Sequence, residues 1–381
     1  MMANYPPRPL ALVRGEGCWV WDEAGSRYLD LVGGIAVVVL GHGHPAPIRA
    51  VAEQSAVLGH ASNLSWTEPG VALAERLCSL SGMDRVFFCN SGAEANEAAI
   101  KLARRHGREV GGDAKHEIVA LEGAFHGRTL GALAATWGEA KKAPFAPLPE
   151  GFRHVPRDDA DALRAAVSAA TAGVLIEPIQ GEGGVHPVDH AYLRLARELC
   201  DEHDALLIFD EVQTGIGRTG EWFAFDGAGV RPDAVTLAKG LGSGLPIGAL
   251  LSRELPTGFR PGDHGTTYGG SPAIAAGALA VLDAIEREGL VDNARAVGAH
   301  LAAGLRALPG VADVRGVGLM LAVELAEGDA AGAAAALRER GVLVNAVSET
   351  ALRLVPPLVL DVEQADLAIA ALADVLAARA R

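Results

Sequence analysis

The chain has 381 residues, half of them apolar, and a formal net charge of −14 at pH 7. This acidic balance argues against a surface that binds nucleic acid or an anionic membrane. The four cysteines are widely spaced without a CxxC pair, so we expect no disulfide scaffold, no metal site and a reducing, cytoplasmic environment. We also expect no signal peptide and no membrane span, because the most apolar run is far shorter than the ~20 residues that a bilayer requires.

The first 55 residues predict an N-terminal arm that contributes to a small domain, with a β-hairpin over residues 18–22 and 27–30. Between residues 56 and 290, where we expect a large domain, short apolar runs alternate with helical patterns. This alternation predicts an α/β fold with a doubly wound, mostly parallel sheet, whose functional sites lie at the carboxyl ends of its strands. The expected strands are residues 86–89, 118–120, 174–177, 206–210, 234–237 and 248–251.

Residues 291–381 show a different pattern and predict a smaller C-terminal α/β domain. The spacing of apolar residues predicts two helices there, one at each end of the segment. Three short strands are expected between them. The helices are residues 294–308 and 364–379, and the strands are residues 318–324, 342–347 and 352–354.

Residues 87–104 predict a strand, a tight turn and a helix. Ser91 and Glu94 fit a capping box, and the alanines that follow at helical spacing predict that one face packs on the sheet. The helix would then begin at Gly92 and Ala93, whose small side chains and free N–H groups suit a phosphate. A well-capped helix without a ligand is the alternative.

Two apolar runs end in a charged side chain. Residues 206–210 end in Asp210, and a buried carboxylate needs a cationic partner such as a pyridinium N–H. A metal is the competing interpretation because Glu211 is adjacent, but neighbouring strand residues point to opposite faces. Lys239 follows an apolar run and precedes several glycines, and desolvation would make its amine a nucleophile, as in a Schiff-base lysine. The alternative is a strand-end lysine with its ammonium in solvent.

Two loops carry further candidate ligands. Phe125 suits stacking on a flat ring, Arg128 suits a carboxylate, and His126 is expected to make loop hydrogen bonds. Thr266 and Thr267 offer hydroxyls to phosphate or carboxylate oxygens. A core phenylalanine, a solvated arginine and a polar turn are the alternatives.

Glu182 lies in a glycine-rich loop, and Arg353 lies in an otherwise apolar strand. An arginine in such a strand is costly unless it is paired with an acid. Taken separately, each residue is better explained as an ordinary surface charge.

In their joint order these stretches resemble the class III (ω-amine) aminotransferases of pyridoxal 5′-phosphate (PLP) fold type I, and most closely the bacterial acetylornithine aminotransferases. The resemblance covers nearly the whole chain. It implies a large domain with a seven-stranded, mostly parallel sheet, a smaller α/β domain, PLP as cofactor, and a homodimer with shared active sites. The segments that carry it are residues 29–37, 40–45, 90–97, 125–129, 210–215, 238–242, 264–267 and 315–320.

The resemblance also implies roles for the PLP-binding residues. Lys239 is similar to the lysine that holds PLP and moves the substrate proton, and Asp210 to the partner of the pyridinium nitrogen. Phe125 resembles the ring-stacking residue, and Gln213 the residue that contacts the ring hydroxyl. The implied phosphate ligands are Gly92, Ala93 and, from the second subunit, Thr267.

Four residues match substrate-binding positions of that family. Arg128 resembles the anchor for the α-carboxylate, and Thr266 a substrate contact from the neighbouring subunit. Glu182 and Arg353 match a switch, in which Glu182 neutralises Arg353 while the amine substrate is bound and releases it to take the carboxylate of glutamate. Ile35 stands where ornithine δ-aminotransferases tend to have tyrosine, which favours an α-N-acylated substrate.

The resemblance therefore implies transfer of the δ-amino group of N2-acetylornithine to 2-oxoglutarate, giving N-acetylglutamate 5-semialdehyde and glutamate, in arginine biosynthesis. The same chemistry on succinylornithine, N-succinyl-diaminopimelate, free ornithine or 4-aminobutyrate is the main alternative. A PLP-binding regulatory protein is the non-enzymatic alternative, although the sequence shows neither a DNA-binding segment nor a spare domain for it.

Overall fold

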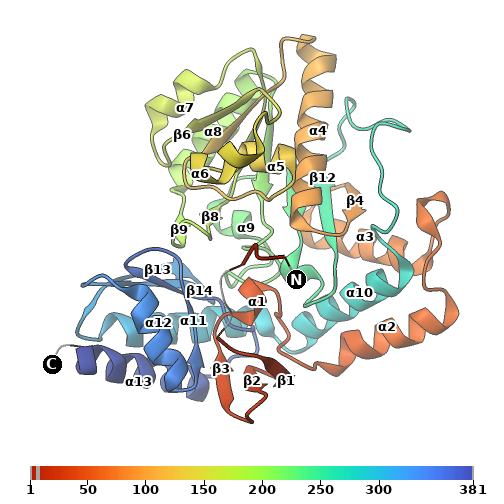
Figure 1. Ribbon diagram of the computed structural model, residues 1–381. Helices are drawn as coiled ribbons and strands as arrows, with labels where there is room; N and C mark the ends of the chain where they lie inside the picture. Colours follow the sequence, from red (N-terminus) through yellow and green to blue (C-terminus); the bar gives the residue numbers. More distant parts are fainter. Residues whose placement is uncertain (1, 6–8, 380–381) are drawn as a thin grey trace.

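The computed structural model describes residues 2–5 and 9–379, and its largest element is a seven-stranded sheet (Figure 1). The strand order is β4-β12-β11-β10-β7-β5-β6, and neighbours are parallel except for β12, which is antiparallel to both of its neighbours. This confirms the predicted fold class. The bounds are β4 (Arg85–Cys89), β5 (Glu117–Leu121), β6 (Phe152–Val155), β7 (Thr171–Ile176), β10 (Leu206–Asp210), β11 (Ala234–Leu237) and β12 (Gly248–Ser252).

The burial of the strands explains why six of them are visible in the sequence. The central strands β7 and β10 are buried along their whole length, so their sequences consist almost entirely of apolar residues. The sequence does not predict β6, which lies at the edge of the sheet and carries an exposed arginine and a partly exposed histidine among its four residues.

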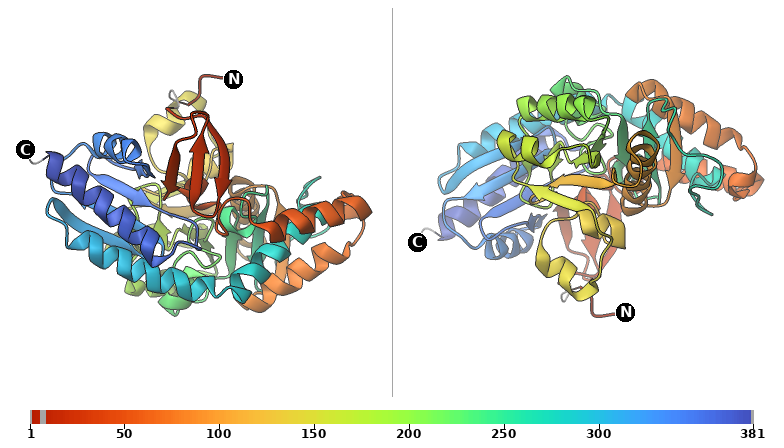
Figure 2. Two further views of the ribbon diagram at one scale, coloured as in Figure 1. Left: turned by 90° about the horizontal axis from the view of Figure 1, so that it is seen from below. Right: turned by 90° about the horizontal axis from the view of Figure 1, so that it is seen from above.

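Helices cover both faces of this sheet, and α4 (Gly92–Gly111) packs on it through the predicted alanine-rich face. A second group extends to one side of the molecule, where α10 (Pro272–Arg287) packs against α2 (Pro45–Val57) and α3 (Glu68–Ser81) (Figures 1 and 2). The smaller elements are η1 (Ser62–Leu64), α5 (Leu130–Ala135), α6 (Glu139–Lys142), η2 (Ala143–Phe145), α7 (Ala160–Ala166), β8 (Ile179–Gln180), β9 (His186–Pro187), α8 (His190–Glu202), α9 (Ala224–Ala228) and η3 (Lys239–Leu241).

The N-terminal strands form a sheet with a strand from the far end of the chain. β1 (Leu12–Glu16), β2 (Trp19–Asp22) and β3 (Arg27–Asp30) form an antiparallel meander that includes the predicted hairpin. β15 (Val342–Leu343) then pairs in parallel with β3. The single strand predicted over residues 342–347 is therefore wrong, because its first half completes this sheet and its second half belongs to another.

The C-terminal part of the chain builds a four-stranded sheet in the order β13-β14-β17-β16. The strand bounds are β13 (Val311–Val317), β14 (Met320–Leu325), β16 (Asn345–Ala346) and β17 (Ala351–Leu354), and the helices are α11 (Leu290–Arg306), α12 (Ala330–Glu339) and α13 (Val362–Arg379). The division into residues 1–55, 56–290 and 291–381 stays a prediction. Within the described ranges, every helix is too short or too polar to cross a bilayer.

Candidate active site

A cavity of about 380 Å³ opens at the carboxyl end of the seven-stranded sheet. Its walls come from segments that follow β4, β5, β7, β10 and β11, which meet there because parallel strands end at the same edge. Among the predicted residues, those that line the cavity are Gly92, Ala93, Phe125, Arg128, Asp210, Gln213 and Lys239. Glu182, Arg353, Thr266 and Thr267 are placed outside its lining.

Asp210 ends β10 as a buried carboxylate that lines the cavity. Its Oδ2 accepts hydrogen bonds from Asn96 Nδ2 at 2.7 Å and from His126 Nδ1 at 2.8 Å. Its Oδ1 accepts the Val212 backbone N–H at 3.1 Å. Oδ1 therefore keeps a lone pair for one more donor, and a carboxylate held in this way suits a cationic N–H.

Asn96 and His126 are the functional partners that sequence reasoning missed. Asn96 is buried on the alanine face of α4, and its Oδ1 accepts the hydroxyl of Thr236 at 2.8 Å, which fixes the direction of the amide. His126 makes the expected hydrogen bonds, but its ring is fully buried against Asp210 and its Nε2 has no partner among the described residues. An amide among alanines was the available signal for Asn96, since an unpaired buried amide is costly.

Lys239 follows β11 on the short turn η3 and reaches the same cavity. Burial lowers the pKa of its amine, and the carboxylates of Glu182 and Asp210 oppose that effect. No hydrogen bond or ion pair from the described part of the chain engages Nζ. The structure thus places an amine with a lowered pKa and a buried carboxylate on adjacent strands, facing one cavity.

The N-terminus of α4 forms a second wall. Ser91 caps the helix by accepting the Glu94 N–H at 3.3 Å, while the Glu94 carboxylate reaches back to the Asn90 N–H at 2.5 Å, one residue earlier than a standard capping box. Gly92 and Ala93 line the cavity at the helix start, where N–H groups lack intrahelical acceptors. A Cβ on Gly92 would stand 2.7 Å from Val212 Cγ1, so a larger residue there would force the valine side chain to shift.

Phe125 and Arg128 lie together on the loop after β5. The Arg128 guanidinium stands 5.4 Å from the centre of the Phe125 ring, and both line the cavity. The Phe125 N–H donates to Glu177 Oε2 at 2.9 Å, and the Gly181 N–H donates to Glu177 Oε1 at 3.4 Å. Burial raises the pKa of Glu177. One buried carboxyl, not predicted as a site residue, therefore joins the aromatic loop to the glycine-rich loop.

Glu182 and Arg353 form an ion pair beside the cavity. Arg353 on β17 is 1% exposed, and its Nη1 donates to Glu182 Oε1 at 2.5 Å. The same Nη1 donates to Gln213 Oε1 at 3.3 Å, and Gln213 Nε2 donates to Glu182 Oε1 at 3.3 Å. Burial raises the pKa of Glu182, but attraction to Arg353 outweighs it and the net shift is downward. Gln213 thus connects the ion pair to the cavity that it lines.

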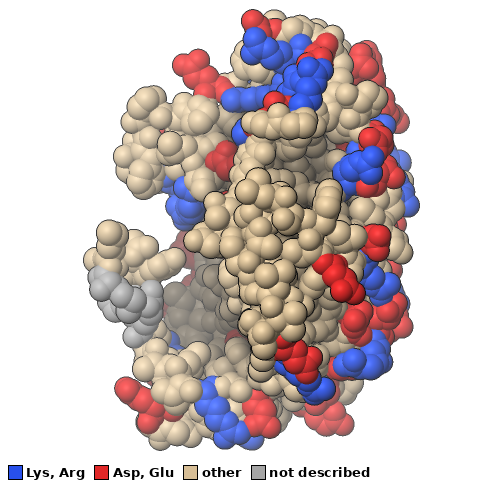
Figure 3. Space-filling view, turned by 90° about the vertical axis from the view of Figure 1, so that its right-hand side faces the viewer, with Lys and Arg blue, Asp and Glu red and all other residues tan. Residues whose placement is uncertain are grey.

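Thr266 and Thr267 lie on a surface loop rather than in the cavity of their own chain. The Thr266 carbonyl accepts a hydrogen bond from Asn63 Nδ2 at 3.0 Å, and Thr267 is exposed to solvent. Nearby apolar side chains are exposed as well, with Trp66 at 93% and Tyr268 at 67%. Figure 3 views the molecule from the side of this loop, and its charged side chains lie mainly toward the margins around a broad uncharged area.

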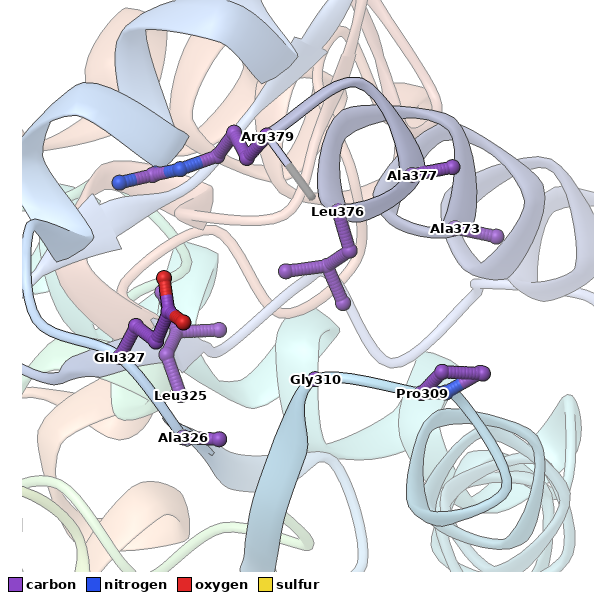
Figure 4. A pocket seen from close by; sticks show the side chains of 9 residues that line it. All are labelled: Pro309, Gly310, Leu325, Ala326, Glu327, Ala373, Leu376, Ala377 and Arg379. Carbon is purple, nitrogen blue, oxygen red and sulfur yellow. The ribbon is translucent and has the colours of Figure 1, made fainter. Parts of the chain in front are cut away.

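A smaller cavity of about 240 Å³ lies in the C-terminal part of the chain, between α13 and the ends of β13 and β14 (Figure 4). Its lining is mostly aliphatic, with Glu327 and Arg379 as charged residues. None of the predicted site residues contributes to it. It therefore lacks the amine and the buried carboxylate that distinguish the larger cavity.

Comparisons with known proteins point to one family. Residues 1–376 match the family described as aminotransferase class-III. The acetylornithine aminotransferase of Mycobacterium tuberculosis is 52% identical over 385 residues, covering 99% of this chain and 94% of that protein.

Solved structures agree in fold. The ornithine aminotransferase of Toxoplasma gondii, whose structure shows partial occupancy of PLP at the active site, is 33% identical, with a TM-score of 0.94 over 99% of this chain and 91% of that chain. The acetylornithine aminotransferase of Elizabethkingia anophelis is also 33% identical, with a TM-score of 0.87 over 99% of this chain and 96% of that chain.

Proposed function

This chain belongs to the class III aminotransferases, and from that premise we propose that it transfers the δ-amino group of N2-acetylornithine to 2-oxoglutarate. The products would be N-acetylglutamate 5-semialdehyde and glutamate, and the step would serve arginine biosynthesis. The enzyme depends on PLP and acts on an amino donor and a keto acid. We also propose a cytoplasmic location, which the four free cysteines support.

PLP, when bound, supplies an electron sink for the charge that develops at the substrate carbon. We assign Asp210 to hold the ring nitrogen as N–H, with Asn96 and His126 fixing the carboxylate. Gly92 and Ala93 would hold the phosphate at the helix N-terminus. Lys239 would carry the proton to and from the reacting carbon, because burial lowers the pKa of its amine.

The observation that carries the proposal is the ion pair of Glu182 with a fully buried arginine. Arg353 always needs an anion, because an unpaired buried charge is strongly unfavourable. Either Glu182 or a substrate carboxylate can meet that need. We assign Glu182 to mask Arg353 while the amine substrate is bound to Arg128, and to leave when glutamate presents its second carboxylate.

The apolar side chains of Ile35 and Val37 support an acylated amine donor. Ile35 lies on α1 (Gly33–Ala36) and is 42% exposed. Val37, the first residue after this helix, lines the cavity. Neither side chain can accept a hydrogen bond from a free α-ammonium group, which supports an acyl-capped nitrogen. Free ornithine is the second candidate, since the solved relative from Toxoplasma gondii is an ornithine aminotransferase.

A substrate panel on the purified enzyme tests this choice. Acetylornithine, succinylornithine, N-succinyl-diaminopimelate, free ornithine and 4-aminobutyrate would each be supplied with 2-oxoglutarate, and glutamate formation would be measured. We expect the highest kcat/KM with acetylornithine. Equal or faster turnover of free ornithine would reject the proposed substrate, and binding of PLP without turnover of any amine would favour a regulatory protein.

Glu182→Ala is expected to separate the two half-reactions. Loss of the mask leaves Arg353 free to attract the wrong carboxylate, so kcat/KM for acetylornithine should fall about 30-fold, or ~2 kcal/mol. The glutamate half-reaction should be unchanged or faster. Single-turnover absorbance changes of the bound cofactor measure each half. Glu182→Gln, which keeps an acceptor but loses the charge, should lie between, and equal losses in both halves would rule out the switch.

We further propose a homodimer in which Thr267 and Thr266 of each subunit complete the other subunit's site. The exposed apolar side chains beside that loop support this, because Leu64 and Trp66 are each more than 90% exposed in the single chain. The Asn63 side chain ties the segment of these residues to the threonine loop through the carbonyls of Thr266 and Gly269.

Mixing two inactive variants tests the shared site. Lys239→Ala removes the amine, and Thr267→Glu places a negative charge against the phosphate. After mixing, unfolding and refolding together, about a quarter of wild-type activity should return, because half of random dimers are mixed and each of these holds one intact site. Mixtures that stay inactive although mixed dimers form would contradict sharing.

A further inference from the structure

Residues 315–320 comprise the hairpin turn between β13 and β14 with the strand ends that flank it, and the proposed chemistry assigns this motif no role. Its residues pack against two loops that follow strands of the seven-stranded sheet. One loop, residues 181–185, carries Glu182. The other, residues 213–220, begins with Gln213. These are the two loops that meet Arg353.

The first loop is held at its C-terminal end by Arg315. Arg315 Nε donates to the Gly184 carbonyl at 2.7 Å, and its Nη1 donates to Glu324 Oε2 at 2.7 Å. The next residue, Val185, is fully buried with φ of +54°, a conformation that a β-branched residue adopts only when its surroundings impose it. Met320 from the same turn packs in one core cluster with Val185.

The second loop is held by the other half of the turn. Arg218 Nη1 donates to the Leu319 carbonyl at 3.0 Å, and the Leu319 N–H donates to the Arg218 carbonyl at 3.1 Å. Gly318 has φ of +58°, and a Cβ there would stand 2.5 Å from the Thr219 backbone. One turn therefore fixes both loops relative to β14, and β14 pairs directly with β17, which carries Arg353.

We propose that Arg315 is a positioning residue for the substrate switch, an inference that rests on the proposed function. When a keto-acid carboxylate displaces Glu182, the loop loses that ion pair. Arg315 still holds Gly184, and Arg353 still holds the Gly181 carbonyl at 3.1 Å. Glu182 then moves as a side chain on an anchored loop and returns to mask Arg353 for the next amine substrate. Without Arg315, the Gly184 carbonyl loses its charged donor, and the position of the C-terminal end of the loop then depends on the burial of Val185 and on the pairing of β8 with β9.

Arg315→Met tests this role through the separate half-reactions. We expect kcat/KM for acetylornithine to fall about tenfold, the size expected for one hydrogen bond from a charged donor, and the glutamate half-reaction to change less than about twofold. In a Glu182→Ala background, adding Arg315→Met should cause no further loss, because no carboxylate remains to be positioned. Arg315→Gln, which shortens the side chain, is a second variant with the same expectation.

Two control variants separate positioning from general damage. Arg306→Met removes a neighbouring arginine that donates to the Val314 carbonyl, and Glu324→Gln keeps an acceptor for Arg315. Both should leave the two half-reactions unchanged, and thermal unfolding and PLP absorbance would be compared across all variants. Equal losses in both half-reactions, or a further tenfold loss in the Glu182→Ala background, would overturn the role. A wild-type enzyme inactive on acetylornithine would instead overturn the proposed function.

Discussion

Replacing Lys239 with alanine is expected to lower transamination by at least about 10⁴-fold, the upper end of the range for a single general acid–base group. The same change should remove the visible absorbance of bound PLP. The reason is the surroundings of the amine, which faces the cavity with a pKa lowered by burial and with no protein partner in the described residues. Initial rates and an absorbance spectrum of the purified variant measure both effects.

Lys142→Ala is the matched control for that experiment. Burial also lowers the pKa of Lys142, but its amine donates to the Ala134 carbonyl at 3.0 Å and does not line the cavity. Its loss should leave both absorbance and turnover intact. A Lys239→Ala protein that keeps its colour and its turnover would show that the amine in the cavity has no part in the reaction.

Asp210→Asn is expected to lower kcat by about 10³-fold, equivalent to ~4 kcal/mol of transition-state stabilisation. The substitution keeps the shape of the side chain, and Asn96 and His126 still surround it. It removes the one negative charge that we assign to the ring nitrogen, so charge developing on the substrate carbon is less stabilised. Single-turnover rates and the dissociation constant for PLP, followed by absorbance, measure the effect.

Glu211→Gln is the matched control for Asp210, because it changes the neighbouring carboxyl to an amide of the same shape. Glu211 points away from the cavity and accepts the Thr214 hydroxyl and the N–H groups of Ala224 and Phe225. Burial raises the pKa of Glu211 to about 7. Activity should change less than about threefold. Wild-type kcat in Asp210→Asn would refute the assignment to the ring nitrogen.

The sequence could predict where the site lies because the rule that links strands to sites is local. Asp210 and Lys239 follow buried runs that form the adjacent parallel strands β10 and β11. Their side chains therefore reach the same edge of the sheet, whatever conformation the connecting loops adopt. The assigned roles of the site residues stay predictions until the variants are measured.

Other parts of the site depend on contacts between distant segments, which no local pattern records. His126 meets Asp210 from a loop 84 residues earlier in the chain, and nothing beside His126 in the sequence marks that partner. Glu177 follows β7 in a position typical of any strand end, yet its two oxygens tie together the loops of Phe125 and Gly181. Such roles follow from packing, not from spacing.

The C-terminal sheet shows a different limit. β13 was not predicted because its residues are mostly exposed or half-buried and include a glycine, so it lacks both alternation and an apolar run. The segment over residues 342–347 looks like one strand because all of its residues except Asn345 are apolar. The chain turns between Leu343 and Asn345 and serves two sheets, which periodicity along one strand cannot reveal.

The parallel pairing of β3 with β15 has a consequence for synthesis on the ribosome. Leu29 leaves the exit tunnel long before its partner Val342 is translated, because the two residues are far apart in the sequence. During that interval the unpaired N–H and C=O groups along the edge of β3 can pair with a strand of another chain. The nascent polypeptide therefore has an unpaired strand edge until Val342 has been made, and a product truncated before Val342 would keep that edge permanently.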